Sequence, residues 1–192
     1  MIESLPNAAQ MWQGRSLVKM LHDWDSNPLK WRNDRLIAQI VGDAKRVADL
    51  GCGDGRLATL LPNVEEYKGY DSSPDMIEAA RKRCARLEHA SFGVCDVFRE
   101  SALAHFDVAV LYDVAIHQKA PLRAVQTVLD LWSADRYVFT LLVGPVREEL
   151  QASVVVSSAE LRQFVKGRTR RYHRKRVANE RFDFLVLEIM QT

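Results

Sequence analysis

The feature that most constrains the fold of this chain is a glycine-rich turn that follows a short apolar run. Residues 47–55 read VADLGCGDG and place glycines at alternate positions, Gly51, Gly53 and Gly55. Glycine lets the backbone turn sharply and leaves no side chain between the backbone and a ligand. A helical pattern follows at residues 56–61. Together these signals predict the strand–loop–helix start of a nucleotide-binding α/β fold.

Two acidic residues indicate which nucleotide ligand such a loop would accept. Arg56 stands where the dinucleotide-binding fingerprint G-x-G-x-x-G requires its third glycine, and Asp49 precedes the loop, where it would repel a pyrophosphate but could hold an ammonium group. Asp71 ends a second apolar stretch about twenty residues past the loop, the usual place for an acid that accepts hydrogen bonds from ribose hydroxyls. This combination fits a ligand with a ribose, a cationic group and no phosphate, such as S-adenosylmethionine.

Four motifs in the same order and spacing resemble those of the class I S-adenosylmethionine-dependent methyltransferases. Residues 47–55 resemble the first motif, and residues 71–76, which run from Asp71 through Pro74 to Met76, resemble the second. Residues 93–97 (GVCDV) resemble the third and residues 106–117 (FDVAVLYDVAIH) the fourth. The resemblance extends from Val47 to the C-terminus.

The resemblance implies which residues bind the donor S-adenosylmethionine. The glycine loop would pack against the methionine part of the donor, and Asp49 would support its ammonium group. Asp71 would bind the ribose hydroxyls. Asp96 and Val97 would contact the adenine, with Met76 packed on the ring. The donor-binding set is therefore Asp49, Gly51, Cys52, Gly53, Gly55, Asp71, Ser72, Met76, Asp96 and Val97. Two simpler interpretations stay open, core packing for Met76 and a turn at a strand end for Asp96.

The segment after the fourth predicted strand supplies the candidate catalytic residues. His117 occupies a position often filled by histidine in the resembled family, and because imidazole as a chemical group can exchange a proton near neutral pH, it is a candidate general base. Its alternative role is to fix the loop. Tyr112 and Asp113 are candidates for holding the acceptor. The other histidines show no ligand spacing, so we expect no metal and no cofactor other than the donor.

Composition places the chain among ordinary globular proteins. It has 192 residues, of which 47% are hydrophobic and 27% charged, with a net charge of +2. Cys52, Cys84 and Cys95 form no C-x-x-C pair, which favours reduced thiols over a disulfide framework. Cys52 is expected to be a small packing residue within the loop. No apolar run approaches the ~20 residues of a membrane span. No signal-peptide pattern opens the sequence, so we expect a cytoplasmic protein.

Alternating strand and helix patterns predict an α/β fold. The expected strands are 47–50, 66–70, 91–95, 106–111 and 136–143, and the expected helices are 56–61, 74–87, 121–132 and 158–166. Helical patterns at 9–24 and 29–41 precede them, and strands at 169–177 and 182–190 form a C-terminal hairpin. We therefore expect a Rossmann-like, doubly wound, seven-stranded and mostly parallel sheet with an antiparallel hairpin and N-terminal helices. Residues 1–192 would form one methyltransferase domain, with 1–44 as a helical cap and 45–192 as the core.

Methyl transfer to an N or O atom of a small-molecule acceptor is the leading functional hypothesis. Trp24 and Trp31, with Trp12, would either cover the mouth of the site or belong to the core. The gap between residue 143 and the helix at 158 leaves no room for an inserted substrate domain. Alternatives are an RNA or protein methyltransferase that uses a basic run at 166–176, and a catalytically inactive donor-binding subunit. A nicotinamide-dependent oxidoreductase is disfavoured by Asp49 and Arg56. The basic run has a simpler explanation as charge that protects a sheet edge. Membrane binding is not expected, and the sequence does not indicate an oligomeric state.

Overall fold

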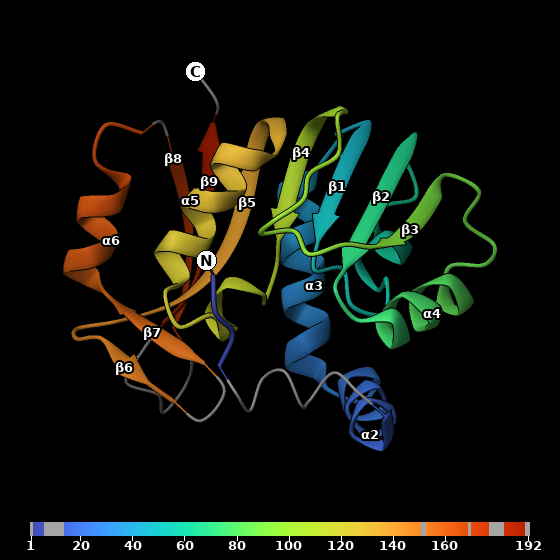
Figure 1. Ribbon diagram of the computed structural model, residues 1–192, viewed down its shortest axis with the longest axis horizontal. Coiled ribbons are helices and arrows are strands. Elements are labelled where there is room, and N and C mark those ends of the chain that lie inside the picture. Colours follow the sequence, from blue (N-terminus) through green and yellow to red (C-terminus); the bar gives the residue numbers. More distant parts are fainter. Residues whose placement is uncertain (1, 6–13, 151–152, 169, 177–182, 191–192) are drawn as a thin grey trace.

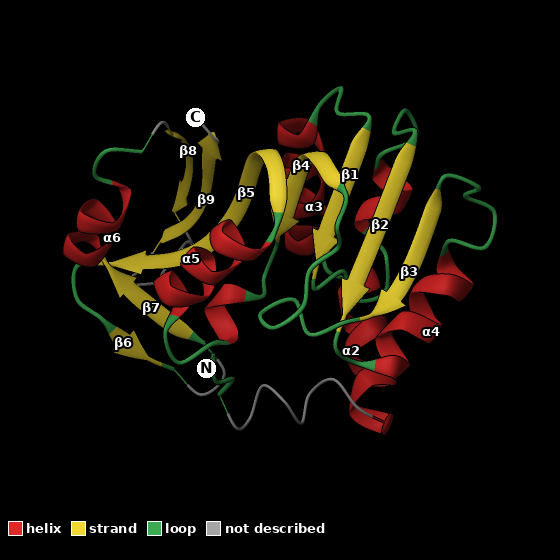
Figure 2. Cartoon of the chain, turned by 45° about the horizontal axis from the view of Figure 1, so that its top comes forward, coloured by secondary structure: helices red, strands yellow, loops and turns green. Residues whose placement is uncertain are grey.

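The computed structural model describes residues 2–5, 14–150, 153–168, 170–176 and 183–190. Five parallel strands form the centre of one sheet in the order β3-β2-β1-β4-β5 (Figures 1 and 2). They are β1 (Arg46–Leu50), β2 (Glu66–Asp71), β3 (Ala90–Val94), β4 (His105–Leu111) and β5 (Ser133–Gly144). The order reverses between β1 and β4. Sequence analysis therefore predicted the number, position and direction of these strands correctly.

The C-terminal hairpin is also confirmed. β9 (Asp183–Met190) pairs antiparallel with β5, and β8 (Arg170–Arg176) pairs antiparallel with β9. The predicted turn at 178–181 lies outside the described residues. These seven strands form the expected Rossmann-like arrangement.

Two further strands lie between β5 and the next helix, where we predicted none. β7 (Val154–Ser157) runs parallel to the end of β5, and the short β6 (Glu148–Glu149) is antiparallel to β7. The last residue of β5 that pairs with β4 is Phe139, so β5 projects beyond its neighbour. β7 pairs with this projecting end at 142–144.

Side-chain caps mark the start of three helices, whereas α5 (Pro121–Leu131) begins after Ala120 without one. α3 (Pro28–Val41) is capped by Asn27, α4 (Pro74–Arg83) by Ser73, and α6 (Ser158–Val165) by a capping box of Ser157 and Glu160. α2 (Gly14–Asp25) precedes α3, and η2 (Ala115–His117) is a short 3-10 turn. Residues 9–13 of the first predicted helix lie outside the described residues.

Two predicted helices differ from the structure. Residues 56–61 form a single 3-10 turn, η1 (Leu57–Leu60), and α4 ends at Arg83 instead of residue 87. Both segments are short stretches of apolar periodicity, which does not distinguish one turn from several.

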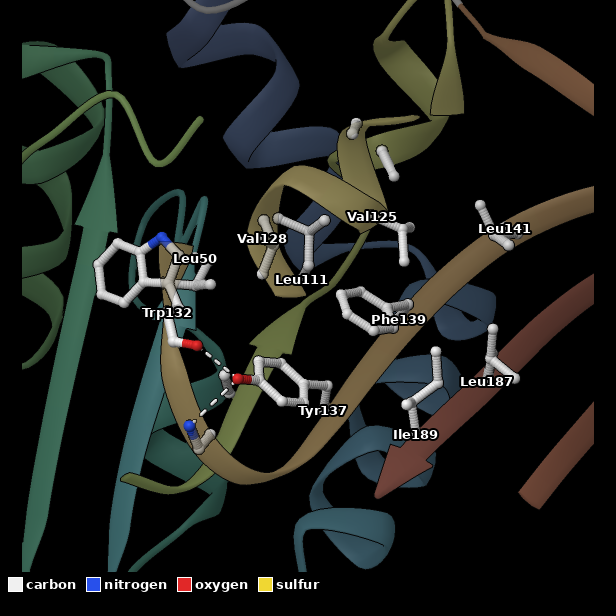
Figure 3. Packing of buried hydrophobic residues seen from close by; sticks show 14 of the residues in the cluster. Leu50, Leu111, Val125, Val128, Trp132, Tyr137, Phe139, Leu141, Leu187 and Ile189 are labelled. Atoms are coloured by element: carbon white, nitrogen blue, oxygen red, sulfur yellow. Dashed lines mark hydrogen bonds between the residues drawn. The ribbon is translucent and has the colours of Figure 1, made fainter. Parts of the chain in front are cut away.

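Helices cover both faces of the sheet, as the doubly wound prediction required. One core lies between the sheet and α5 and α6, and a second lies between the sheet, α3 and η1. Figure 3 shows part of the first core, where Val125 and Val128 of α5 face Phe139 of β5. The hydroxyl of Tyr137 is buried there and donates to the Trp132 carbonyl. No helix in the described part of the chain is long and apolar enough to cross a membrane.

The carboxyl ends of β1, β2 and β4 meet at one edge of the sheet, and α2 lies beyond that edge (Figures 1 and 2). At the opposite edge, the carboxylate of Asp107 accepts hydrogen bonds from the backbone N–H groups of Lys45 and Arg46 at 2.6 and 3.0 Å. In open α/β sheets, ligands bind at the carboxyl edge where the strand order reverses. The strand order therefore places the expected ligand site at the ends of β1 and β4.

Candidate functional site

A cavity of about 770 Å³ lies at the carboxyl edge of the sheet. This volume is within the range of sites for small organic ligands. Every predicted site residue except Gly55 lines it: Asp49, Gly51, Cys52, Gly53, Asp71, Ser72, Met76, Asp96, Val97, Tyr112, Asp113 and His117. The structure therefore brings together residues from four separate sequence motifs.

The three glycines of the loop all have positive φ angles but differ in their surroundings. Gly51 has φ 82°, and a Cβ there would lie 2.2 Å from Cγ2 of Val114. A Cβ on Gly55 would meet Cys84 Sγ at 3.0 Å, so Gly55 serves the packing of the loop on α4. At Gly53, with φ 53°, a Cβ would meet no atom within 4 Å. Gly53 therefore offers bare backbone to the cavity, whereas Gly51 and Gly55 are required by packing.

Asp49 is a buried carboxyl group at the end of β1. Its Oδ2 accepts a hydrogen bond from the hydroxyl of Tyr67 on β2, and the residue lines the cavity. Burial raises the pKa of Asp49 from 3.8 to about 7; the Tyr67 hydrogen bond opposes this shift, and the nearby Asp71 adds to it. A buried carboxyl with a raised pKa is suited to a cationic partner, which would restore its charge.

Asp71 at the end of β2 organises two segments around the cavity. Its Oδ2 accepts a hydrogen bond from Gly53 N at 3.0 Å, and its Oδ1 accepts one from Ser73 N at 2.9 Å. Burial raises its pKa, while these backbone hydrogen bonds oppose the shift. Each carboxylate oxygen can accept more than one hydrogen bond, so hydroxyl groups of a ligand can still bind.

The third part of the cavity is more apolar. Met76 is 1% exposed and lines the cavity from α4. Asp96 Oδ1 accepts from Phe98 N at 3.1 Å and Oδ2 pairs with Arg99 at 3.2 Å, so the acid also stabilises its own turn. Val97 uses its carbonyl for the indole N–H of Trp132. The position of Val97 at the cavity wall fits a flat apolar ligand group.

Cys52 lines the cavity but lacks the properties of a nucleophile. Its thiol is buried, and burial together with Asp49 raises its pKa well above the ordinary value. A thiol of this kind stays protonated and behaves as a small apolar group. The expectation of a packing role agrees with this environment.

Another side of the cavity is formed by the segment after β4, where sequence analysis placed the candidate catalytic residues. Asp113 has a left-handed backbone with φ 56° and is the only non-glycine residue with positive φ in the described ranges. Thr140 holds it in place, accepting from Asp113 N at 2.7 Å and donating to Oδ1 at 3.3 Å. His117 lies on η2 and lines the cavity. The hydroxyl of Tyr112 donates a hydrogen bond to Asp34 Oδ1 at 2.8 Å. Burial raises the pKa of Tyr112, so this hydroxyl stays protonated and is poorly suited to accept a proton from a ligand.

Sequence analysis missed a charged cluster that α3 contributes to this side. The Lys30 ammonium lies 3.0 Å from Asp113 Oδ2 and 3.5 Å from Asp34 Oδ1. Asp34 is 2% exposed, and burial raises its pKa although Lys30 opposes this. The only sequence signal was the i, i+4 spacing of Lys30 and Asp34, which more often marks a solvated helix face.

Arg56, noted only as a departure from the dinucleotide fingerprint, joins the glycine loop to the N-terminal helices. Its guanidinium is buried, with Nη2 2.8 Å from Asp25 Oδ1 and Nε 3.5 Å from Asp34 Oδ2. Its Cζ lies 4.8 Å from the ring centroid of Trp31. Arg83 links Asp25 to the loop residue Asp54, which it contacts at 2.6 Å. The end of α2 and the first half of α3 are thus held against the loop by charge.

The tryptophans and the basic run are only partly described. Trp24 lines the cavity, Trp31 packs on Arg56, and Trp12 lies outside the described residues. In the basic run, Arg168 donates to Gln126 and to the Phe164 carbonyl, while Arg171 on β8 is exposed. Among the described residues, no group of three or more His, Cys, Asp or Glu side chains has an arrangement that could hold a metal ion.

The strand order, the glycine loop and the acids at the ends of β1 and β2 are those of a class I S-adenosylmethionine-dependent methyltransferase. A family model described as a methyltransferase domain matches residues 42–182. The chain belongs to this methyltransferase family.

Curated relatives match over part of their length. Nodulation protein S of Bradyrhizobium diazoefficiens is 28% identical over 113 residues, which cover 57% of this chain and 53% of the relative. Ubiquinone biosynthesis O-methyltransferase of Neisseria meningitidis is 30% identical over 139 residues, covering 69% of this chain and 56% of the relative. The chain spans about half the length of the curated relatives it matches.

A solved structure has the same fold over most of its length. N-methyltransferase NodS from Bradyrhizobium japonicum WM9 superposes with a TM-score of 0.69 at 18% identity, covering 87% of this chain and 98% of that chain. The same enzyme in complex with S-adenosylhomocysteine gives a TM-score of 0.68.

Proposed function

We propose that this protein transfers the methyl group of S-adenosylmethionine to an N or O atom of a small-molecule acceptor. The observation that carries the proposal is the cavity in which a bare glycine backbone and two strand-end carboxyl groups, Asp49 and Asp71, face the same space. Family membership supports the same donor. Relatives named as an N-methyltransferase and an O-methyltransferase support both acceptor atoms.

The donor would lie along the ends of β1 and β2. Asp49 would take the ammonium group of its methionine part, which would draw the carboxyl to its charged form. Gly53 leaves space for the main chain of the loop to approach that part, with Gly51, Cys52 and Gly55 shaping the turn. Asp71 and Ser72 would bind the ribose hydroxyls. Met76, Asp96 and Val97 would surround the adenine.

The bound donor supplies an electrophilic methyl group on a sulfonium. Transfer is an in-line displacement, so the main task of the protein is to align the acceptor with that group, which can lower the barrier by ~7–11 kcal/mol. Tyr112 and Asp113 would hold the acceptor. His117 would either receive the proton that the acceptor loses or fix the loop.

Transfer of a labelled methyl group tests the proposal. The protein, incubated with labelled S-adenosylmethionine and pools of small amines, alcohols and phenols, should yield labelled product together with S-adenosylhomocysteine. Asp71→Ala should abolish product formation. Label that enters only RNA or protein would favour the alternative acceptors, and donor binding without transfer to any pool would favour an inactive donor-binding subunit.

A further inference from the structure

The ammonium group of Lys30 is surrounded by two aromatic rings and two carboxylates. Its Nζ lies 3.9 Å from the ring centroid of Tyr112 and 5.2 Å from that of Trp24. Asp113 Oδ2 lies at 3.0 Å and Asp34 Oδ1 at 3.5 Å. Aromatic faces and carboxylates around one point are the chemistry by which proteins bind organic ammonium ions.

This arrangement lies inside the cavity, on the side formed by the segment after β4. All four surrounding residues line the same cavity as Asp49 and Gly53. Trp24 lies at the end of α2, Asp34 lies within α3, and Tyr112 and Asp113 lie in the segment after β4. The Lys30 side chain is 15% exposed, so a ligand that enters the cavity can reach its position.

Asp113 is held in this position at a cost to the backbone. A left-handed conformation is uncommon for residues other than glycine, and such strain concentrates at functional sites. Here φ is 56°, and two hydrogen bonds with Thr140 maintain it. The carboxylate of Asp113 is 29% exposed, whereas that of Asp34 is buried. Asp113 is therefore the carboxylate that an incoming ligand would meet.

The charge of the cavity favours a cationic acceptor. Among the described residues, Lys30 and Arg56 are the only lysine or arginine that line the cavity. Seven aspartates line it: Asp34, Asp49, Asp54, Asp71, Asp75, Asp96 and Asp113. Lys30 and Arg56 are already paired with carboxylates. An acceptor with its own carboxylate would enter a field of like charge without a cation left to receive it.

We infer that the acceptor is an organic amine, whose cationic nitrogen is received by Asp113 and the faces of Tyr112 and Trp24, at a position that the Lys30 ammonium fills in the free protein. This inference rests on the proposed function and names the acceptor class of the same cavity. Lys30 is then an internal ligand that the cation of the acceptor displaces.

The chemical step balances with this acceptor. The ammonium form gives one proton to a base, for which His117 lines the cavity, and becomes a neutral amine. The nitrogen lone pair forms the new N–C bond to the donated methyl group as the C–S bond breaks. The electron pair of the C–S bond remains on sulfur and the positive charge of the sulfonium passes to nitrogen, so the products are the methylated ammonium ion and S-adenosylhomocysteine.

Binding of three compact probes to the protein loaded with S-adenosylhomocysteine tests the inference. The probes are tetramethylammonium, neopentyl alcohol and pivalate, which each carry a trimethyl-substituted central atom and are of similar size but have positive, zero and negative charge. Ligand-observed NMR should rank their affinities for the unmodified protein in that order. A preference for pivalate or for the alcohol would overturn the inference.

Variants of Lys30 test the displacement. Lys30→Met removes the internal ammonium and should tighten tetramethylammonium binding about tenfold, whereas Lys30→Arg and the surface control Lys45→Met should not. Equal affinity in Lys30→Met and Lys45→Met would contradict the inference. If Lys30→Met does not fold, the ranking by the unmodified protein still decides. Failure of S-adenosylhomocysteine to bind would reject the proposed function itself, whereas its binding with the wrong probe preference would reject only the amine.

Discussion

The hydroxyl of Tyr67 donates a hydrogen bond to Oδ2 of Asp49 between the adjacent strands β1 and β2, and both residues are buried. This pair holds a carboxyl group at the edge of the cavity without neutralising it. The carboxyl is costly to the free protein because burial favours its protonated form, with a pKa of about 7. A cationic ligand would offset this cost, so the charged carboxyl that favours ligand binding lowers the stability of the free protein.

The first prediction concerns Asp49→Asn. The folded pKa is about 7 and the ordinary value 3.8, so the folded state binds more protons between these values and loses stability as pH rises through them. Because asparagine keeps the Tyr67 partner and carries no charge, it should raise the free energy of unfolding by roughly 1–3 kcal/mol at about pH 8 and by little at about pH 4. Denaturant unfolding at both pH values measures this. Destabilisation at the higher pH would contradict the assignment.

The second prediction concerns donor affinity and pH. Below a pKa of about 7, Asp49 is mostly protonated in the free protein and must release its proton to receive an ammonium. The affinity for S-adenosylmethionine should therefore fall by up to about tenfold per pH unit below that value. Calorimetry in buffers of different ionisation enthalpy should detect proton release at about pH 6 that vanishes in Asp49→Asn. A pH-independent affinity would show that Asp49 does not meet the ammonium.

The third prediction separates two glycines of the loop. Gly51→Ala places a Cβ 2.2 Å from Val114 Cγ2, so it should lower the free energy of unfolding by several kcal/mol. Gly53→Ala meets no atom within 4 Å and should cost only ~1–2 kcal/mol of backbone strain, but its methyl group would enter the donor site. Thermal unfolding and donor titration of both variants measure this. Normal donor affinity in Gly53→Ala would exclude close approach of the donor at that residue.

The fourth prediction concerns Arg56. Its guanidinium is 5% exposed and pairs with the buried Asp34. Arg56→Met should therefore destabilise the protein by ~3 kcal/mol, because it leaves that carboxyl without one of its cations. The matched control is Lys82→Met, which removes an exposed i, i+4 pair with Glu78 and should have a much smaller effect because solvent screens that pair. Equal effects of the two variants in denaturant unfolding would contradict a structural role for Arg56.

Local patterns were sufficient to predict the strands other than β6 and β7 and the glycine loop, and the family resemblance added residues that, except for Gly55, line the cavity. An apolar run followed by alternating glycines has few other solutions, and the parallel sheet then brings Asp49 and Asp71 to one edge. The length of short elements was less predictable. Residues 56–61 became one 3-10 turn, and β7 formed because β5 projects beyond β4.

The charged contacts of Lys30 and Arg56 form only in the tertiary fold, so no pattern of neighbouring residues in the sequence predicts them. Lys30 and Asp113 are 83 residues apart in sequence and meet only when α3 packs against the end of β4. Arg56 and Asp25 are 31 residues apart and meet where the end of α2 packs against the glycine loop. Lys30, Arg56 and Asp25 appear in the sequence as ordinary surface charges, which is why sequence analysis did not assign them to the site.

Calorimetric titration of the protein with S-adenosylmethionine and S-adenosylhomocysteine tests the central claim most directly. Asp71→Ala is the site variant, and the exposed helix variant Asp130→Ala is its control. We predict micromolar binding of both ligands that Asp71→Ala weakens at least about tenfold, because it removes a ribose partner and releases Gly53, and that Asp130→Ala leaves unchanged. Absence of binding, or equal affinity in Asp71→Ala, would contradict the assignment of this cavity as the donor site.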